Sequence, residues 1–301
     1  MIKARQEALT LGAVAYDPKV ITIWDGFQRF FGERGLAFDY VLYTNYERQV
    51  EGHLAGEHDV AWNSPLAWIE AERVAPAYGK RARAIAMRDS DRDLTSVVLV
   101  RSDGPIRSVA DLAGRRIAVG AGDSPQATLL PLLHLAEAGL ATRPPNGEEK
   151  ENVAVVVVHD VLVGKHGDHI GGERDAVKAL VRGEVDAACV LDANTVGFAR
   201  EGTVPEGATR TLATTAPFDH CNFTVLDDAD GTNKKSPLLA RFTELLLGMK
   251  YDDPTVRPLM DLEGLKAWLP GRTTGYAALA RACERFGTIE PWVRGMKAAR
   301  S

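Results

Sequence analysis

Residues 96–120 read SVVLVRSDGPIRSVADLAGRRIAVG, and this stretch decides how the chain is organised. The apolar run at 96–101 predicts a strand, and the polar and Gly/Pro residues at 102–105 predict a turn. A short helix is predicted at 108–112 and a new strand at 116–120. A chain that ends a strand, turns and starts again in this way is expected to leave one α/β lobe and enter another.

Strand and helix patterns alternate along the rest of the chain, which predicts an α/β fold with largely parallel sheets. The other predicted strands are 9–14, 38–43, 59–62, 83–87, 153–159, 186–191 and 222–226. The predicted helices are 21–31, 47–55, one that begins at residue 65, 126–138, 172–182 and most of the chain after residue 237. The run at 153–159 is the most apolar, so it is predicted to be a buried central strand.

The chain is expected to return to the first lobe at residues 213–223, which read ATTAPFDHCNF. The first lobe is then discontinuous and comprises residues 1–101 and 222–301, and the second lobe comprises residues 102–221. Two crossing strands would form a hinge on which the lobes close over a ligand.

Composition excludes several classes of protein. The 301 residues are 45% hydrophobic and 26% charged, with a formal net charge of -5. This is a globular composition without the basic excess that nucleic-acid or membrane-surface binding needs. Three cysteines without a CxxC pair exclude a disulfide framework and a thiolate zinc site. No signal-peptide pattern or membrane-spanning run is found, so we expect a cytoplasmic protein, or a periplasmic or lipid-anchored one if a signal sequence was removed.

Four segments carry a resemblance to a known family. They are GEHDVAWNSPLAW at 56–68, IRSVADLAGRRIAVG at 106–120, GDSPQATLLPLLHLAEAGL at 122–140 and GGERDAVKALVRGEVDAACVLD at 171–192. Together they resemble the type 2 periplasmic-binding-protein fold, in particular the phosphate/phosphite/phosphonate solute-binding group. The resemblance implies a two-lobe α/β fold that binds a small anionic molecule (a phosphonate, phosphate ester, sulfonate or carboxylate) in the cleft between the lobes. It implies a transporter permease as partner if the protein is exported.

The same fold also includes enzymes in lineages without a signal peptide. The alternative hypothesis is therefore a cytoplasmic lyase or decarboxylase that needs no cofactor and uses a cleft histidine as acid and base. Ala127 stands where the family usually offers a hydroxyl, and Glu173 and Arg174 stand where a family histidine is expected.

The residues themselves also point to an anion site. Ser64, Ser124 and Gly172 begin predicted helices, whose first N–H groups and positive dipole ends attract anions. Each could equally be a plain helix cap. Aromatic and polar side chains that follow predicted strands or start predicted helices would line the pocket. The candidate ligand-binding residues are Tyr16, Asp17, Tyr43, Asn45, Trp62, Asn63, Ser64, Ser124, Gln126, Thr128, Lys165, Gly172 and Asp192. Trp62 could instead belong to the core.

Residues 164–175 read GKHGDHIGGERD, and this segment has the highest density of side chains that could act in binding or catalysis. His166, His169 and Glu173 have the i, i+3, i+7 spacing of a metal site, and His220 could replace Glu173 in such a metal-dependent enzyme. The neighbouring glycines favour a loop that contacts substrate instead.

Candidate catalytic residues are His166, His169, His220, Glu173 and Cys221. Neighbouring residues on a strand point to opposite faces, so His220 is not expected to activate Cys221, whose base would be His166 or His169. Cys221 could also be a buried structural cysteine. Residues 88–92 are predicted to be a salt-bridged surface turn.

Overall fold

The computed structural model describes residues 8–147, 150, 152–160 and 170–300, with only the backbone of residue 170. The chain forms two compact units, which are described separately. Unit 1 comprises residues 1–92, 219–276 and 289–301, and unit 2 comprises residues 93–218 and 277–288.

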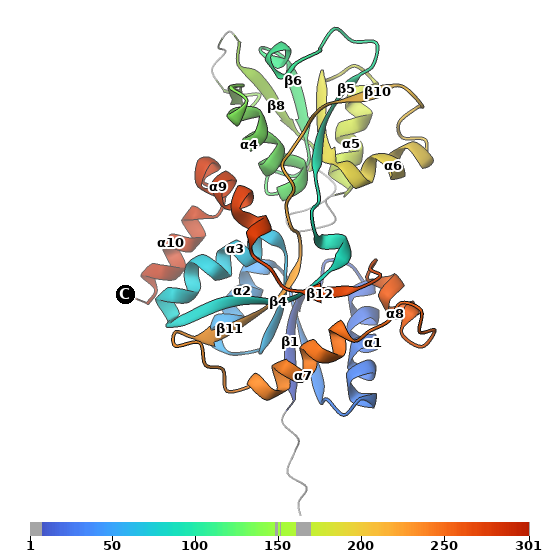
Figure 1. The fold of residues 1–301 in the computed structure, drawn as a ribbon. Helices are drawn as coiled ribbons and strands as arrows, with labels where there is room; N and C mark the ends of the chain where they lie inside the picture. The colour runs from blue at the N-terminus through green and yellow to red at the C-terminus, as the bar shows by residue number, and fades with distance from the viewer. Residues whose placement is uncertain (1–7, 148–149, 151, 161–169, 301) are drawn as a thin grey trace, which may run out of the picture. The chain divides into compact units, whose positions relative to one another are not determined.

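Unit 1 contains a mixed six-stranded sheet in the order β12-β4-β11-β3-β1-β2 (Figure 1). Its strands are β1 (Leu9–Val14), β2 (Phe38–Tyr43), β3 (Val60–Asn63), β4 (Lys80–Arg88), β11 (Asn222–Asp228) and β12 (Trp268–Pro270). β1 pairs in parallel with β2 and β3, whereas β11 runs antiparallel to β3 and β4. Its helices are α1 (Lys19–Glu33), α2 (Tyr46–Ala55), α3 (Pro65–Val74), α7 (Ser236–Leu247), α8 (Arg257–Leu262) and α10 (Glu290–Ala298).

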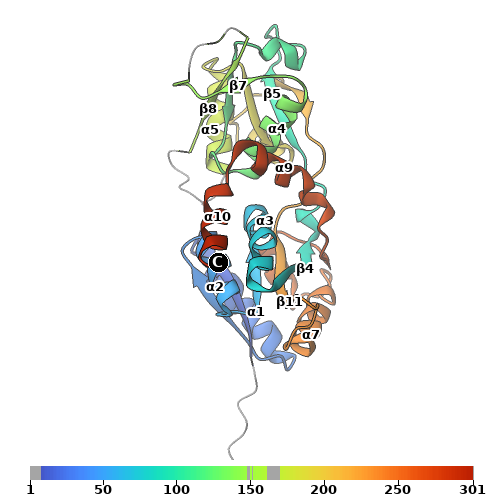
Figure 2. The ribbon, with the colours of Figure 1, turned by 90° about the vertical axis from the view of Figure 1, so that its left-hand side faces the viewer.

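The core of unit 1 is aromatic. Apolar residues of α1 recur at helical spacing, which gives the helix one buried face that includes Trp24, Phe27 and Phe31. This face packs against Phe242 of α7 and Phe223 of the sheet. α2 and α3 contact each other and the strands, and α10 lies beside α3 (Figure 2), where Arg73 pairs with Glu290.

Unit 2 contains a second mixed six-stranded sheet, in the order β10-β5-β9-β6-β8-β7. Its strands are β5 (Ser96–Arg101), β6 (Arg116–Val119), β7 (Thr142–Arg143), β8 (Ala154–Val158), β9 (Ala187–Leu191) and β10 (Thr209–Thr214). β6 pairs in parallel with β8 and β9, and β5 runs antiparallel to β9 and β10. Its helices are α4 (Leu130–Glu137), α5 (Ile170–Val181), α6 (Asp192–Arg200) and α9 (Ala277–Phe286), and a π-helical turn, η4 (Pro125–Leu129), leads into α4.

Single helical turns complete both units. They are η1 (Ala75–Tyr78), η2 (Asp89–Asp91), η3 (Val109–Leu112) and η5 (Thr274–Tyr276). None of the described helices combines the length and apolarity that crossing a bilayer requires.

Several expectations need correction. β8 is not central: only the two-residue β7 covers its outer side, so its burial alternates and Val158 is 41% exposed. The sheets are mixed rather than largely parallel. The chain after residue 237 is mostly helical, as expected, but the three-residue β12 joins the first sheet beside β4. Residues 93–101 and 277–288 belong to unit 2, because β5 pairs with β9 and β10 and α9 packs on α4.

Candidate functional site

A buried ion-pair cluster lies where β4 ends in unit 1. The η2 turn brings Asp91 back over Arg88, whose Nε and Nη2 donate to Asp91 Oδ2 and Oδ1 at 2.5 and 3.0 Å. Arg88 Nη1 also donates to Glu263, to the carbonyl oxygen at 2.9 Å and to Oε2 at 3.0 Å. The guanidinium lies 5.0 Å from the ring centre of Trp62, and Asp91 is only 2% exposed. The expected surface turn at 88–92 is therefore wrong for Arg88 and Asp91.

His220 and Cys221 complete this cluster. His220 Nδ1 lies 3.5 Å from Asp91 Oδ1 and 3.1 Å from Cys221 Sγ, and the His220 N–H donates to the Asp91 carbonyl at 2.8 Å. The expectation that His220 and Cys221 point apart is wrong. They precede β11, which begins at Asn222, so the alternation of a strand does not apply to them.

Contacts within the cluster set the pKa values of its residues. Burial favours the neutral form of Asp91, but Arg88 and His220 outweigh it and lower the pKa of Asp91 to about 2. Burial likewise opposes protonation of His220, but the Cys221 sulfur and Asp91 outweigh it and raise the pKa of His220 to about 10. Burial raises the pKa of Glu263, although Arg88 opposes this. At neutral pH the cluster therefore holds two cations, Arg88 and His220, beside firmly ionised Asp91 and beside Glu263, which pairs with Arg88.

Three tyrosines adjoin the cluster. Burial is the main cause that raises the pKa of Tyr16 to about 12 and raises those of Tyr46 and Tyr276. The pKa of each phenol also responds to Cys221, which places all three in its neighbourhood. Tyr16 is 41% exposed, so part of its side chain is open to solvent.

Hydrogen bonds and an ion pair join the segment 272–276 to residues 219–222. Arg272 donates to both carboxylate oxygens of buried Asp219, at 2.7 and 2.5 Å. The Tyr276 hydroxyl donates to the His220 carbonyl at 2.7 Å. A Cβ at Gly275 would lie 2.2 Å from the carboxyl carbon of Asp219, so only glycine permits this approach. These contacts hold His220 in place.

The cluster does not fit a metal centre. Among the described residues, Asp91, His220 and Cys221 form the one group whose ligand atoms lie within 4.8 Å of one another. Arg88 already occupies both oxygens of Asp91, however, and a guanidinium repels a divalent cation.

Several candidate residues of unit 1 have structural partners. Asp17 Oδ1, Asn45 Oδ1 and Ser64 Oγ accept backbone N–H groups of α1, α2 and α3 at 2.7, 2.8 and 3.3 Å. Asn45 and Ser64 are the N-caps of their helices, and Asp17 bonds to the first residue of α1. Trp62 lies in the core and contacts Phe223, and buried Asn63 bonds to Gln49 and Thr224. Tyr43 donates to Glu57 at 2.9 Å. Of the candidates in unit 1, the structure gathers Tyr16, Trp62, His220 and Cys221 at the cluster.

In unit 2 the structure gathers two helix starts. Gln126 Nε2 donates to Glu173 Oε1 at 3.3 Å and thereby joins η4 to α5. Gly172 approaches the end of β8 so closely that a Cβ there would lie 2.3 Å from the His159 carbonyl oxygen. Ser124 Oγ caps the helix by accepting from the Ala127 N–H at 3.2 Å, and Thr128 donates to the Ala121 carbonyl at 2.7 Å.

Glu173 is a structural acceptor rather than a metal ligand or acid catalyst. It is fully buried, and its Oε2 accepts from the Leu191 N–H and from Asn194 Nδ2 at 2.8 and 3.0 Å. Asp192 begins α6 and is exposed. Lys165, His166 and His169 lie outside the described residues.

Sequence reasoning missed Arg88, Asp91, Tyr46 and Glu263 as parts of the candidate site. Arg88 and Asp91 have the i, i+3 spacing of an ion pair, which was visible in the sequence. Their burial was not, because Glu263 and His220 lie far away along the chain.

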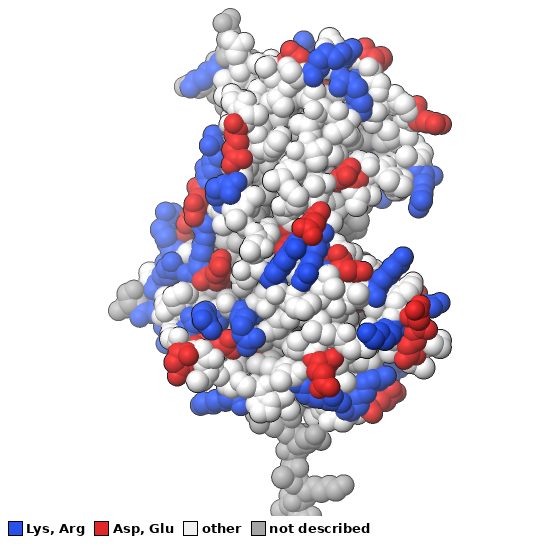
Figure 3. Space-filling model, viewed as in Figure 1, with Lys and Arg blue, Asp and Glu red and all other residues white. Residues whose placement is uncertain are grey.

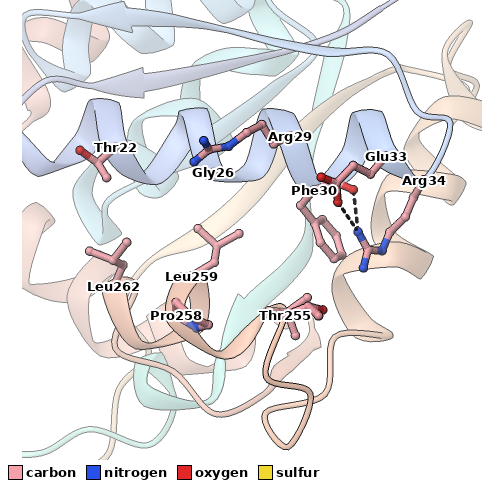
Figure 4. A pocket seen from close by; sticks show the side chains of 11 residues that line it. Thr22, Gly26, Arg29, Phe30, Glu33, Arg34, Thr255, Pro258, Leu259 and Leu262 are labelled. Atoms are coloured by element: carbon pink, nitrogen blue, oxygen red, sulfur yellow. Dashed lines mark hydrogen bonds and ion pairs between the residues drawn. The ribbon is translucent and has the colours of Figure 1, made fainter.

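A shallow groove lies elsewhere in unit 1, between α1 and α8 (Figure 4). Its volume is about 260 Å³, and Leu259 and Leu262 form part of its lining. At one end Arg34 lies 4.0 Å from the ring centre of Phe30 and 3.6 Å from Glu33. The groove shares no residue with the cluster. On the face shown in Figure 3, acidic and basic side chains are interspersed over unit 1. We place the candidate site at the cluster, because shifted pKa values gather there.

Comparison with known proteins gives one family. A family model described as the periplasmic substrate-binding protein of a phosphonate ABC transporter matches residues 15–276. None of the curated proteins matches the sequence. The expectation of a cytoplasmic protein is not supported, and nothing specific favours a lyase or decarboxylase.

Solved structures share the fold at low sequence identity. PhnD1 of Prochlorococcus marinus in complex with methylphosphonate has a TM-score of 0.62 and 14% identity, with 95% of this chain and 100% of that chain covered. A Xanthomonas citri protein bound to ATP has a TM-score of 0.67 and 18% identity, with 93% and 98% covered. The aliphatic sulphonate binding protein SsuA of Escherichia coli has a TM-score of 0.52 and 15% identity, with 95% and 88% covered. These likenesses establish a two-lobe α/β fold of the type 2 periplasmic-binding-protein kind.

Proposed function

The chain belongs to the family of periplasmic substrate-binding proteins of phosphonate ABC transporters, and on this premise we propose that it binds a small anionic solute and delivers it to a transporter permease. The solute is a phosphonate, phosphate ester, sulfonate or carboxylate. The same premise favours a periplasmic location. The observation that carries the proposal is the family match over residues 15–276, which include most of both units.

The charge of the unit 1 cluster supports an anionic ligand. Arg88 and His220 are cations at neutral pH, with Asp91 beside both and Glu263 Oε2 3.0 Å from Arg88 Nη1. The phenol of Tyr16 adds a neutral donor at the exposed side. Both cations attract an anion that reaches the partly exposed edge of the cluster at His220.

The helix starts of unit 2 support the same ligand class. Gln126 and Glu173 hold the first turns of η4 and α5 together, next to the end of β6. First-turn N–H groups lack partners within their helix, and the helix dipole adds positive potential there. The hydroxyl groups of Ser124 and Thr128 form hydrogen bonds with the backbone. We therefore assign anion binding in unit 2 to backbone N–H groups.

Thermal shift and calorimetry test this function. The purified chain is screened at neutral pH against methylphosphonate, ethanesulfonate, inorganic phosphate, acetate and ATP. A true ligand at 100 times its Kd should stabilise the fold by about 2.7 kcal/mol. If none of these anions shifts the melting temperature at millimolar concentration, the proposal fails.

Two conservative variants then test the role of the cluster. Tyr16→Phe removes one hydroxyl from an exposed ring, and His220→Gln removes one cation. Each should weaken binding of the best anion about tenfold. Arg83→Gln is the matched control, because Arg83 lies on the same strand as Arg88 but pairs with Asp227. Equal affinities in all three variants would place the binding site elsewhere.

A further inference from the structure

The sulfur of Cys221 is a feature of the cluster that anion binding does not explain. It lies 3.1 Å from His220 Nδ1, at a position that is only 7% exposed but adjoins the partly exposed His220 and Tyr16. The other cysteines, Cys189 on β9 and Cys283 on α9, are fully buried. We propose that Cys221 is a modification site, at which a small hydroperoxide oxidises the sulfur to a sulfenic acid with His220 as the proton carrier.

The geometry supplies what a reactive thiol needs. The thiolate is the nucleophilic form of cysteine, and a basic or cationic neighbour within hydrogen-bond distance promotes it. His220 is that neighbour, and Asp91 and the Tyr276 hydroxyl fix its orientation. The other titratable groups whose pKa responds to the Cys221 charge are Arg88 and the tyrosines 16, 46 and 276.

The reaction balances with the hydroperoxide as the only co-reactant. Cys221 reacts as the thiolate while His220 Nδ1 carries the proton, and the sulfur attacks one peroxide oxygen as the O–O bond breaks. The leaving oxygen takes the proton from His220 and departs as water or an alcohol. The sulfur loses two electrons and becomes S–OH, and the peroxide gains them.

Oxidation should switch off ligand binding, an extension that rests on the proposed function. The new hydroxyl adds an oxygen atom beside His220 and Arg88, the two cations assigned to the anion. A thiol reductant would convert the sulfenic acid back to the thiol. The modification would therefore couple uptake of the anion to oxidative conditions.

The first experiment asks which cysteine reacts. The reduced full-length chain is treated with hydrogen peroxide, sulfenic acid is trapped with dimedone, and the three cysteines are quantified by mass spectrometry. Cys221 should be labelled at least tenfold faster than Cys189 and Cys283. Equal rates at the three positions would overturn the proposal, and this comparison needs no variant that might fold poorly.

The second experiment asks whether His220 carries the proton. His220→Gln should slow labelling of Cys221 at least tenfold and change its pH profile, whereas His134→Gln on α4 of unit 2 should leave both unchanged. An unchanged rate in folded His220→Gln, checked by circular dichroism, removes His220 from the reaction.

The third experiment measures methylphosphonate affinity before and after peroxide. The affinity of the wild type should fall at least tenfold after peroxide and recover after dithiothreitol. The affinity of Cys221→Ser should not change with peroxide, whatever its starting value. A wild type that keeps its affinity after full labelling refutes the switch. If the untreated chain binds no anion, the proposed function fails while the labelling result still decides the modification site.

Discussion

Two stacked histidines in unit 1 should make this unit sensitive to acid. His53 on α2 and His58 before β3 are both buried, with ring centres 4.6 Å apart. Burial lowers the pKa of His53 from 6.5 to about 4. Burial, with a smaller contribution from the neighbouring His53, lowers the pKa of His58 from 6.5 to about 2. Both rings are therefore neutral in the folded protein well below the pH at which they titrate in the unfolded chain.

The sign and size of the effect follow from proton linkage. Between pH 6.5 and 4 the unfolded state binds protons at both histidines and the folded state does not, so stability falls as the pH falls. At pH 4.5 each histidine should lower the free energy of unfolding by about 2.5 kcal/mol, and the pair should lower it by about 5 kcal/mol. That is a large share of the roughly 5–15 kcal/mol that holds a typical domain folded.

Tryptophan fluorescence can follow this unit alone. All five tryptophans (positions 24, 62, 68, 268 and 292) belong to unit 1. Urea unfolding followed by their emission at pH 7.5 and pH 4.5 should show the loss of about 5 kcal/mol. In His53→Gln the loss should shrink to about half, because one titrating group is gone.

Two outcomes would refute this reasoning. If His53→Gln loses as much stability between pH 7.5 and 4.5 as the wild type, the histidine pair is not the source of the loss. A wild-type stability that stays constant from pH 7.5 to 4.5 would show that the rings are protonated in the folded state. His134→Gln, a change in unit 2, is the control and should leave the fluorescence transition unchanged.

Three further predictions concern other parts of the fold. The pKa of His220 is raised to about 10, so its protonation stabilises the folded state fully below pH 6.5, and this stabilisation is lost as the pH rises through 10. Urea midpoints should therefore fall over this range more in the wild type than in His220→Gln. Gly172→Ala would place a methyl group 2.3 Å from the His159 carbonyl oxygen and should cost about 1–3 kcal/mol in a transition seen by circular dichroism, whereas Gly122→Ala, which has open space, should cost little. Phe27→Ala should cost about 3–5 kcal/mol in tryptophan-detected urea unfolding, because Phe27 is fully buried in the core of unit 1; a cost below 1 kcal/mol would contradict its packing.

Local pattern determined much of the secondary structure. β1, β2 and β5 have the bounds that their apolar runs predicted, and α3 begins at Pro65 after the cap Ser64. These features depend on neighbours within a few residues, namely side-chain alternation, a capping hydroxyl and the fixed backbone angle of proline. The cap at Ser124 was visible for the same reason, whereas α5 begins at Ile170, two residues before the predicted start at Gly172.

Tertiary structure alone decided the chemistry of the cluster. Arg88 and Asp91 look like surface residues because charged side chains are usually solvated, yet Trp62, His220 and Glu263 enclose them. The contact between His220 and Cys221 depended on where β11 begins. Composition and periodicity report only what a residue prefers on average, whereas burial and charge pairing depend on segments that meet across more than a hundred residues of chain.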